Sequence, residues 1–177
     1  MNKILCVILA GGRGSRFGSP LKFLTHVCGK PLIEKLLTDI EIVCRYTVIA
    51  LSKRTLDAVH VCKNKHYIAE CVETSGEDLV HDLALLLEMF PKPLLVVGAD
   101  IYMTNNKILI DFIDRALKTE ENVVTLVVNN DGEKLVGITL FKKSYGSWRN
   151  ITYPKNSVMD IDDYDDLKRV ERECHQF

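Results

Sequence analysis

The sequence lacks the long apolar runs and the charge excess that mark several large classes of protein. Its longest apolar runs span about seven residues, whereas a helix that crosses a bilayer needs about 20. Lysine and arginine together number 23 and aspartate and glutamate 24, which gives a net charge of −1. This balance argues against a general binder of nucleic acid or of a membrane surface, because either partner would favour an excess of positive charge.

Closely spaced cysteine pairs are also missing. The six cysteines are Cys6, Cys28, Cys44, Cys62, Cys71 and Cys174. Without a Cys-x-x-Cys pair we do not expect a zinc site. The even count leaves a disulfide framework open, but 177 residues that are 47% hydrophobic can build a core without one. Because no secretory leader is legible at the start either, we expect free, mostly buried thiols in a reducing cytoplasm.

Strand-like and helix-like patterns alternate along the first 128 residues. Apolar strand patterns fall at 3–9, 46–51, 67–72, 94–100 and 122–128, and helical patterns at about 31–43, 53–64, 79–90 and 105–117. The third of these helices is expected to bury Leu79, Leu83, Leu86 and Phe90. Such alternation indicates right-handed βαβ units. We therefore predict one α/β domain over 1–177, with a mostly parallel, Rossmann-like sheet flanked by helices.

The alternation ends after residue 128. A strand is predicted over 135–141 with no helix before it, and 148–158 is predicted to be irregular or extended. A last helix is predicted to begin at Asp162 or Asp163, since acidic side chains favour a helix N-terminus. The final quarter of the chain therefore departs from simple βαβ order.

A glycine-rich loop with basic residues follows the first strand. Its glycines are Gly11, Gly12, Gly14 and Gly18, and its cations are Arg13, Arg16 and Lys22. Glycines at this density let backbone N–H groups approach an anion with no side chain in the way. Added positive charge suits a triphosphate. We therefore predict a phosphate-binding loop.

Two commoner phosphate loops do not fit this segment. A Walker A loop needs Gly-Lys followed by Ser or Thr, but Gly29-Lys30 is followed by Pro31. The dinucleotide fingerprint needs a third glycine where this chain has Phe17. The sequence therefore argues against a P-loop enzyme and against a dehydrogenase.

Polar residues at two other strand ends are candidates for the same site. Asp100 closes the apolar run Leu94–Ala99, and a carboxylate at the carboxyl edge of a parallel sheet can hold Mg²⁺ against phosphate oxygens. Thr74, Ser75 and Gly76 follow the third predicted strand. They can contact a base or ribose, but capping of the next helix explains them equally well.

The loop and the segment after it resemble the signature of nucleotidyltransferases with a glycosyltransferase-A-like fold. The resemblance rests on Leu9-Ala-Gly-Gly-Arg-Gly-Ser-Arg-Phe-Gly18, Lys22 and Gly29-Lys-Pro-Leu-Ile33. It implies nucleotide binding by Leu9, Ala10, Gly11, Gly12, Arg13 and Gly14, together with Thr74, Ser75 and Gly76. It further implies catalytic roles for Arg16 and Lys22, and Mg²⁺ held by Asp100. A second metal contact from Asp160 or Asp162 is implied more weakly, because Asp163 and Tyr164 stand where that family usually has Thr and Pro.

Later segments resemble one branch of that superfamily, the archaeal GTP:adenosylcobinamide-phosphate guanylyltransferases. These segments are Glu73–Leu83, Pro93–Asp100, Val136–Ile138 and the start of the last helix. The resemblance implies GTP and adenosylcobinamide phosphate as substrates, with the acceptor pocket within 129–158. Transfer to molybdopterin or to a sugar 1-phosphate stays open, as does a GTP-sensing module without catalysis. A homodimer also stays open, since the sequence does not reveal the oligomeric state.

Overall fold

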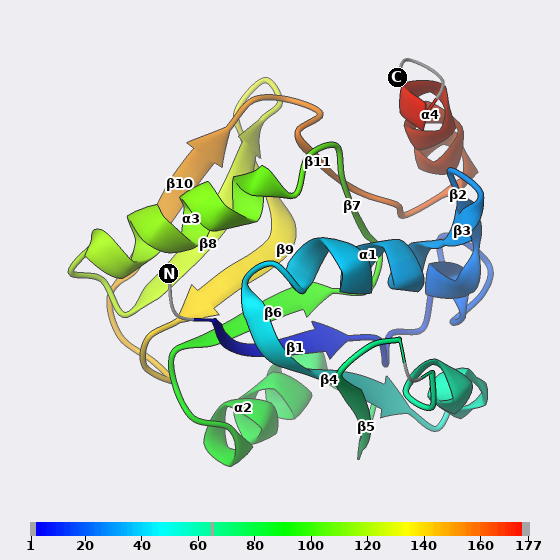
Figure 1. Ribbon diagram of the computed structural model, residues 1–177, viewed down its shortest axis with the longest axis horizontal. Helices are drawn as coiled ribbons and strands as arrows, with labels where there is room; N and C mark the ends of the chain where they lie inside the picture. The colour runs from blue at the N-terminus through cyan, green and yellow to red at the C-terminus, as the bar shows by residue number, and fades with distance from the viewer. Residues whose placement is uncertain (1–2, 65, 175–177) are drawn as a thin grey trace.

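The computed structural model describes residues 3–64 and 66–174, and a seven-stranded sheet forms its centre (Figure 1). The strand order is β10-β8-β9-β6-β1-β4-β5. The strands are β1 (Ile4–Leu9), β4 (Cys44–Ser52), β5 (Ala69–Thr74), β6 (Leu94–Gly98), β8 (Val123–Asn129), β9 (Glu133–Phe141) and β10 (Trp148–Tyr153). Strand β9 runs antiparallel to its neighbours β6 and β8, and the other pairings are parallel. The predicted α/β fold with a mostly parallel sheet is therefore confirmed.

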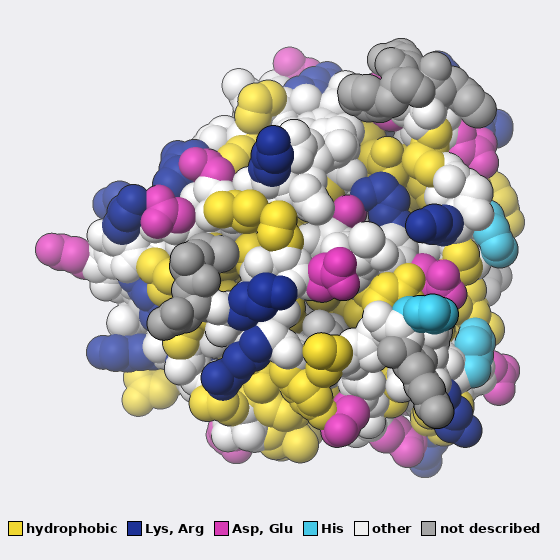
Figure 2. Space-filling view, viewed as in Figure 1, with side chains coloured by type: hydrophobic (Ala, Val, Ile, Leu, Met, Phe, Trp, Pro, Cys, Tyr) yellow, Lys and Arg dark blue, Asp and Glu magenta, His cyan; other side chains and the backbone are white. Residues whose placement is uncertain are grey.

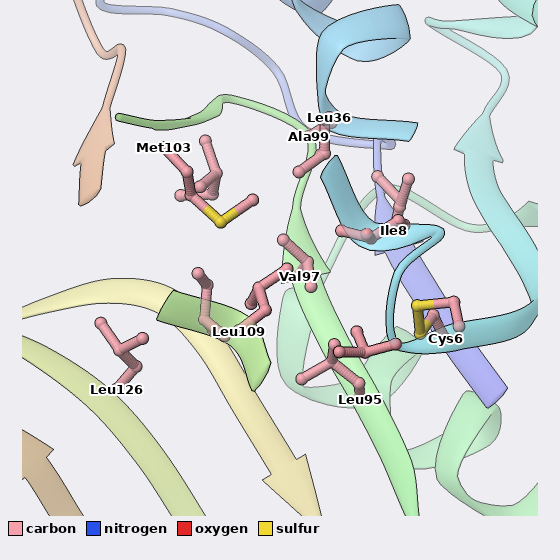
Figure 3. Packing of buried hydrophobic residues seen from close by; sticks show 14 of the residues in the cluster. Cys6, Ile8, Leu36, Leu95, Val97, Ala99, Met103, Leu109 and Leu126 are labelled. Atoms are coloured by element: carbon pink, nitrogen blue, oxygen red, sulfur yellow. A yellow bond between two sulfur atoms is a disulfide. The ribbon is translucent and has the colours of Figure 1, made fainter. Parts of the chain in front are cut away.

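Helices cover both faces of this sheet. Helices α1 (Leu32–Ile40) and α3 (Lys107–Lys118) lie on one face, and α2 (Leu79–Met89) lies on the other (Figure 1). On β1, Cys6 and Ile8 point into the core below α1 and α3, and Val7 points into the core below α2. Figure 3 shows Ile8, Leu36 and Val97 among the side chains of the larger of these cores. Burial on both faces explains why β1 is a continuous apolar run rather than an alternating one.

Smaller elements extend the carboxyl edge of the sheet. They are the hairpin β2 (His26–Val27) and β3 (Lys30–Pro31), the pair β7 (Ile101–Met103) and β11 (Val158–Asp160), and helix α4 (Tyr164–Cys174). Helix α4 stands beside the β2–β3 hairpin (Figure 1). Side chains of the glycine-rich loop and α4 contact each other directly, since the rings of Phe17 and Tyr164 stack with centroids 4.6 Å apart.

The structure corrects several predicted elements. The helix predicted over 53–64 is a short 3₁₀ helix, Leu56–Val61. Of the two alternatives predicted for 148–158, irregular or extended, the structure shows the extended one, since the segment contains β10 and the start of β11. Leu79 is 65% exposed, because it lies in the first turn of α2 above the edge of the sheet.

The prediction of free thiols is wrong, because all six cysteines, each within the described residues, form disulfides. The pairs are Cys6–Cys44, Cys28–Cys174 and Cys62–Cys71. Their Cα atoms lie 5.5–5.8 Å apart, within the range that a disulfide requires. Two pairs join positions 38 and 146 residues apart, so the fold and not the spacing brings them together. The thiol argument for a reducing cytoplasm is thereby lost.

The surface shows the charge balance expected from the composition. Acidic and basic side chains are interspersed over the face shown in Figure 2. Among the described helices, none has the length and apolar character that crossing a membrane requires.

Thiol titration tests the disulfide pairing. Denatured without reductant, the chain should show fewer than one reactive thiol, and six after reduction, because every cysteine is paired. Reduction should also lower the free energy of unfolding by about 2–5 kcal/mol for each disulfide lost, since the unfolded chain gains freedom. Six thiols reacting before reduction would contradict the pairing.

Candidate active site

Two adjoining hollows open where the carboxyl ends of β1, β4, β5 and β6 meet. One has a volume of about 310 Å³ and the other about 60 Å³, and Leu9, Gly12 and Asp100 line both. Strand β1 has β4 on one side and β6 on the other, so the order of the strands in the sheet reverses at β1. Open α/β sheets bind ligands at such a reversal of strand order, outside the carboxyl ends of the strands.

The ammonium group of Lys22 connects the carboxylate of Asp100, which lines the smaller hollow, to the carboxylate of Asp162. Its Nζ lies 2.6 Å from Oδ2 of Asp100 and 3.2 Å from Oδ1 of Asp162, and it donates to the carbonyl oxygen of Ile161 at 3.0 Å. The three side chains are largely buried, with exposures of 16% for Lys22, 26% for Asp100 and 18% for Asp162. The structure thus brings together predicted residues from opposite ends of the chain.

Backbone contacts fix the two carboxylates in place. Asp100 follows β6 in the turn before β7, so the strand ends two residues earlier than predicted. The N–H of Ile161 donates to the carbonyl oxygen of Asp100 at 2.9 Å, which ties the turn to the segment after β11. The N–H of Asp162 donates to the carboxylate of Asp166 in α4 at 3.1 Å. Asp160, the other candidate, instead pairs with Lys134 at 2.6 Å.

The pKa of Lys22 is raised above its ordinary value. Burial acts to lower this pKa, but the charges and hydrogen bonds of Asp100 and Asp162 outweigh it. Lys22 therefore stays protonated throughout the physiological range. Arg16 adds a second cation: its Nη1 lies 2.9 Å from Oδ2 of Asp162, and its side chain is 74% exposed.

The predicted phosphate loop passes close to other backbone. Gly14 has a φ of +59°, and a Cβ there would lie 1.9 Å from the carbonyl oxygen of Ser19. A Cβ at Gly12 would meet nothing within 4 Å, so the fold does not require glycine there. Gly12 lines both hollows, and absence of a side chain keeps its backbone accessible to a ligand.

Buried Ser52, at the end of β4, lies between the glycine-rich loop and the turn after β5. Its Oγ donates to the carbonyl oxygen of Gly11 at 2.9 Å. A Cβ at Gly76 would lie 2.4 Å from the Cβ of Ser52, and Gly76 has a φ of +66°. Thr74, Gly76 and Gly11, three of the residues predicted to bind a nucleotide, line the larger hollow.

Not every predicted residue lies in the hollows. Arg13 points to the rim, where its Nη2 lies 3.3 Å from Oε2 of Glu77. The hydroxyl of Ser75 donates to Asp82, and helix α2 is capped by Asp78 and not by Thr74 or Ser75. Asp82 is a functional candidate that the sequence analysis missed, since nothing in the sequence distinguishes it from an ordinary acid in a first helical turn.

Asp100 and Asp162 fit a divalent cation such as Mg²⁺. Both are carboxylates held near one point, and hard oxygen donors are the ligands that this ion prefers. Within residues 3–64 and 66–174, no group of three or more His, Cys, Asp or Glu side chains forms a closed metal cage. A cation here would therefore need further oxygen ligands, which a triphosphate or water can provide.

Solved structures of other proteins share the fold of this chain. A protein of Bacillus anthracis assigned as a glucose-1-phosphate thymidylyltransferase aligns with a TM-score of 0.81, at 13% identity over 98% of this chain and 96% of the other. The CTP:phosphocholine cytidylyltransferase of Streptococcus pneumoniae aligns with a TM-score of 0.69, at 16% identity over 96% and 98% of the two chains. The fold is that of nucleotidyltransferases.

The family follows from the sequence itself. Residues 6–153 match the MobA-like NTP transferase domain, and the chain therefore belongs to that family. Among curated proteins it is similar to the adenosylcobinamide-phosphate guanylyltransferase of Methanocaldococcus jannaschii, with 27% identity covering 93% of this chain and 94% of the other.

Replacement of Gly14 or Gly12 by alanine should distinguish a glycine that the fold requires from one that it does not require. We expect Gly14→Ala to lower the free energy of unfolding by about 1–3 kcal/mol, because it combines a positive φ with a backbone clash. Gly12→Ala should change stability by less than about 0.5 kcal/mol. Thermal and denaturant unfolding measure both. Equal losses of stability in the two variants would contradict the described loop.

Proposed function

We propose that this protein is a guanylyltransferase that transfers GMP from GTP to adenosylcobinamide phosphate. The observation that carries the proposal is the similarity to the M. jannaschii enzyme of that name, which extends over nearly the whole of both chains. Membership of the NTP transferase family and the cluster of Lys22, Asp100 and Asp162 support the general chemistry. The choice of acceptor depends on the relative alone.

The reaction that we propose is a direct displacement. A phosphate oxygen of the acceptor attacks the α-phosphorus of GTP and forms a new P–O–P linkage. The bond between the α-phosphorus and the oxygen that bridges it to the β-phosphorus breaks, and pyrophosphate leaves with that electron pair. The attacking phosphate is already ionised at neutral pH, so neither a protein nucleophile nor a strong general base is required.

The residues of the cluster would act by positioning and by charge. Backbone N–H groups of Gly11, Gly12 and Gly14 would bind the phosphates, as glycine-rich loops do. Lys22 would contribute a fixed positive charge to the α-phosphoryl group, where negative charge develops, and Arg16 one to the leaving pyrophosphate. Because Lys22 is already protonated, its positive charge would be in place before the substrates bind.

Asp100 and Asp162 would hold Mg²⁺. Bound there, the ion would neutralise triphosphate oxygens. The two carboxylates would also orient Lys22, so that the same pair positions both cations of the site.

The acceptor would approach from the side of β9. Gly137 of β9 lines the larger hollow beside Gly98 and Asp100, and it lies within the segment 129–158 where the acceptor pocket is predicted. We keep the cytoplasm as the proposed location, because GTP is an intracellular substrate.

Release of pyrophosphate tests the proposed function. The purified protein with Mg²⁺ is given each of the four ribonucleoside triphosphates, with and without adenosylcobinamide phosphate. We expect release only with GTP and that acceptor. Release with molybdopterin or a sugar 1-phosphate would keep the family and replace the acceptor. GTP binding without release for any acceptor would contradict an enzymatic role.

Removal of the charge of Lys22 should impair catalysis. We expect Lys22→Met to lower kcat by about 10²–10³, the scale of losing one preorganised charge partner. Lys118→Met is a matched control, because that side chain is 72% exposed and pairs with Asp114 on α3. Rates of pyrophosphate release from both variants provide the measurement. An unchanged kcat in Lys22→Met would remove Lys22 from the mechanism.

A further inference from the structure

The disulfide Cys28–Cys174 is the one of the three that is most open to solvent. Cys28 is exposed and Cys174 is half-buried, whereas the other four cysteines, all of which the structure describes, are buried or half-buried. A disulfide is reduced when a thiolate attacks one of its sulfur atoms directly, so access helps to decide which bond reacts. A reductant therefore reaches Cys28 more readily than any other cysteine of the chain.

Cys28 lies at the tip of the β2–β3 hairpin, in a backbone conformation that favours other residues. The hairpin pairs Val27 with Lys30, so Cys28 and Gly29 form a two-residue turn. Their φ angles are +52° and +80°. Turns of this kind favour asparagine, aspartate or glycine, and other side chains are uncommon at positive φ. The turn itself therefore does not explain a cysteine at this position, whereas the chemistry of its sulfur does.

The disulfide joins this turn to the last residue of α4. Helix α4 has 11 residues, and isolated helices shorter than about 12–15 residues are marginal in water. Leu167 and Val170 are its buried residues, and they pack into a small core that is separate from the two cores of the sheet. Figure 1 shows α4 beside the β2–β3 hairpin rather than over the central sheet. The position of α4 therefore depends on this small core and on the disulfide at its carboxyl end.

The first turn of α4 contacts the catalytic end of the molecule. Asp166 accepts a hydrogen bond from the N–H of Asp162 at 3.1 Å, and Asp162 pairs with Lys22 at 3.2 Å. The ring of Tyr164 stacks on that of Phe17 in the glycine-rich loop. Release of α4 would therefore loosen one carboxylate of the site and the loop together.

We propose that Cys28–Cys174 is a redox-active disulfide, whose reduction by a dithiol releases α4 and lowers the transferase activity. A thiolate of the dithiol attacks Sγ of Cys28, and the Cys28–Cys174 bond breaks with its electron pair going to Sγ of Cys174. The second thiol of the reductant then displaces Cys28 from the mixed disulfide. Two electrons and two protons thus pass from the dithiol, which becomes a disulfide, to two cysteine thiols.

The proposed cytoplasmic location would expose this bond to such reductants. Glutathione and thioredoxin keep cytosolic thiols reduced, so an exposed disulfide there is open to attack. The inference rests on the proposed nucleotidyltransferase function for its effect on activity. Opening of the bond and release of α4 do not depend on that function.

Partial reduction of the unaltered protein tests the effect on activity. Dithiothreitol is titrated against the oxidised protein, thiols are located by alkylation and mass spectrometry, and pyrophosphate release is measured at each point. We expect Cys28 and Cys174 to be labelled first and kcat to fall about 10- to 100-fold with them, the scale of displacing a positioning group by about an ångström. Reoxidation of an unlabelled sample should restore the rate. An unchanged rate after labelling of this pair would overturn the inference, as would earlier labelling of another pair.

Hydrogen exchange follows α4 without reference to activity. On reduction we expect the amide hydrogens of Tyr164–Cys174 to exchange about 10-fold faster or more, because the helix loses its tether, while those of the sheet keep their rates. If α4 keeps its protection, the inference fails while the proposed function stands. If the oxidised protein releases no pyrophosphate with any nucleotide and acceptor, the proposed function fails, and exchange in α4 still decides whether the bond controls the helix.

Paired serine variants locate the effect in one disulfide. Cys28→Ser with Cys174→Ser should have the rate of the reduced wild-type protein and should not respond to dithiothreitol. Cys62→Ser with Cys71→Ser is the matched control, because that disulfide joins the edge strand β5 to the residue after the 3₁₀ helix. The control should keep the wild-type rate and its loss on reduction. A wild-type rate in the first variant would overturn the inference; circular dichroism checks folding, and the titration of the unaltered protein decides if a variant does not fold.

Discussion

The ammonium group of Lys22 is the interaction on which the catalytic end of this molecule depends. It joins Asp100, at the end of β6, to Asp162, which lies 140 residues after Lys22 in the sequence. Two carboxylates this close and this buried would repel each other without a cation between them. Lys22 thus holds the last segment of the chain against the sheet, and it does so with the same charge that the proposed reaction uses.

The other end of the site is built from close backbone approach. Gly11, Ser52 and Gly76 pack so tightly that a side chain at Gly76 would overlap Ser52. Asp82 then fixes the turn from behind through three hydrogen bonds. One end is therefore shaped by charge and the other by steric fit and hydrogen-bond direction, which suits a ligand with a charged triphosphate and a neutral base.

The sequence predicts what depends on local pattern. Apolar runs located the parallel strands, and the interleaving of glycine with Arg13, Arg16 and Lys22 identified the loop. Contacts between distant segments are not predictable from the sequence, because they exist only in the folded chain. They are the ion pair of Lys22 with Asp162, the hydrogen bond from Ser52 to Gly11 and the disulfide Cys28–Cys174. Asp82 looked like an ordinary helical acid, and Leu79 like a core residue, because helical periodicity does not show where the sheet ends.

A crystal structure with Mg²⁺ and a non-hydrolysable GTP analogue would test the account most directly. We expect the triphosphate along the loop of Gly11, Gly12 and Gly14, the α-phosphate beside Lys22, the ion between Asp100 and Asp162, and guanine against the turn of Thr74 and Gly76. A third hollow, of about 340 Å³, lies at the amino edge of the sheet and is lined by Arg45, Tyr46 and His66. Nucleotide bound there, with Lys22 still paired to both carboxylates and no ion between them, would contradict the account.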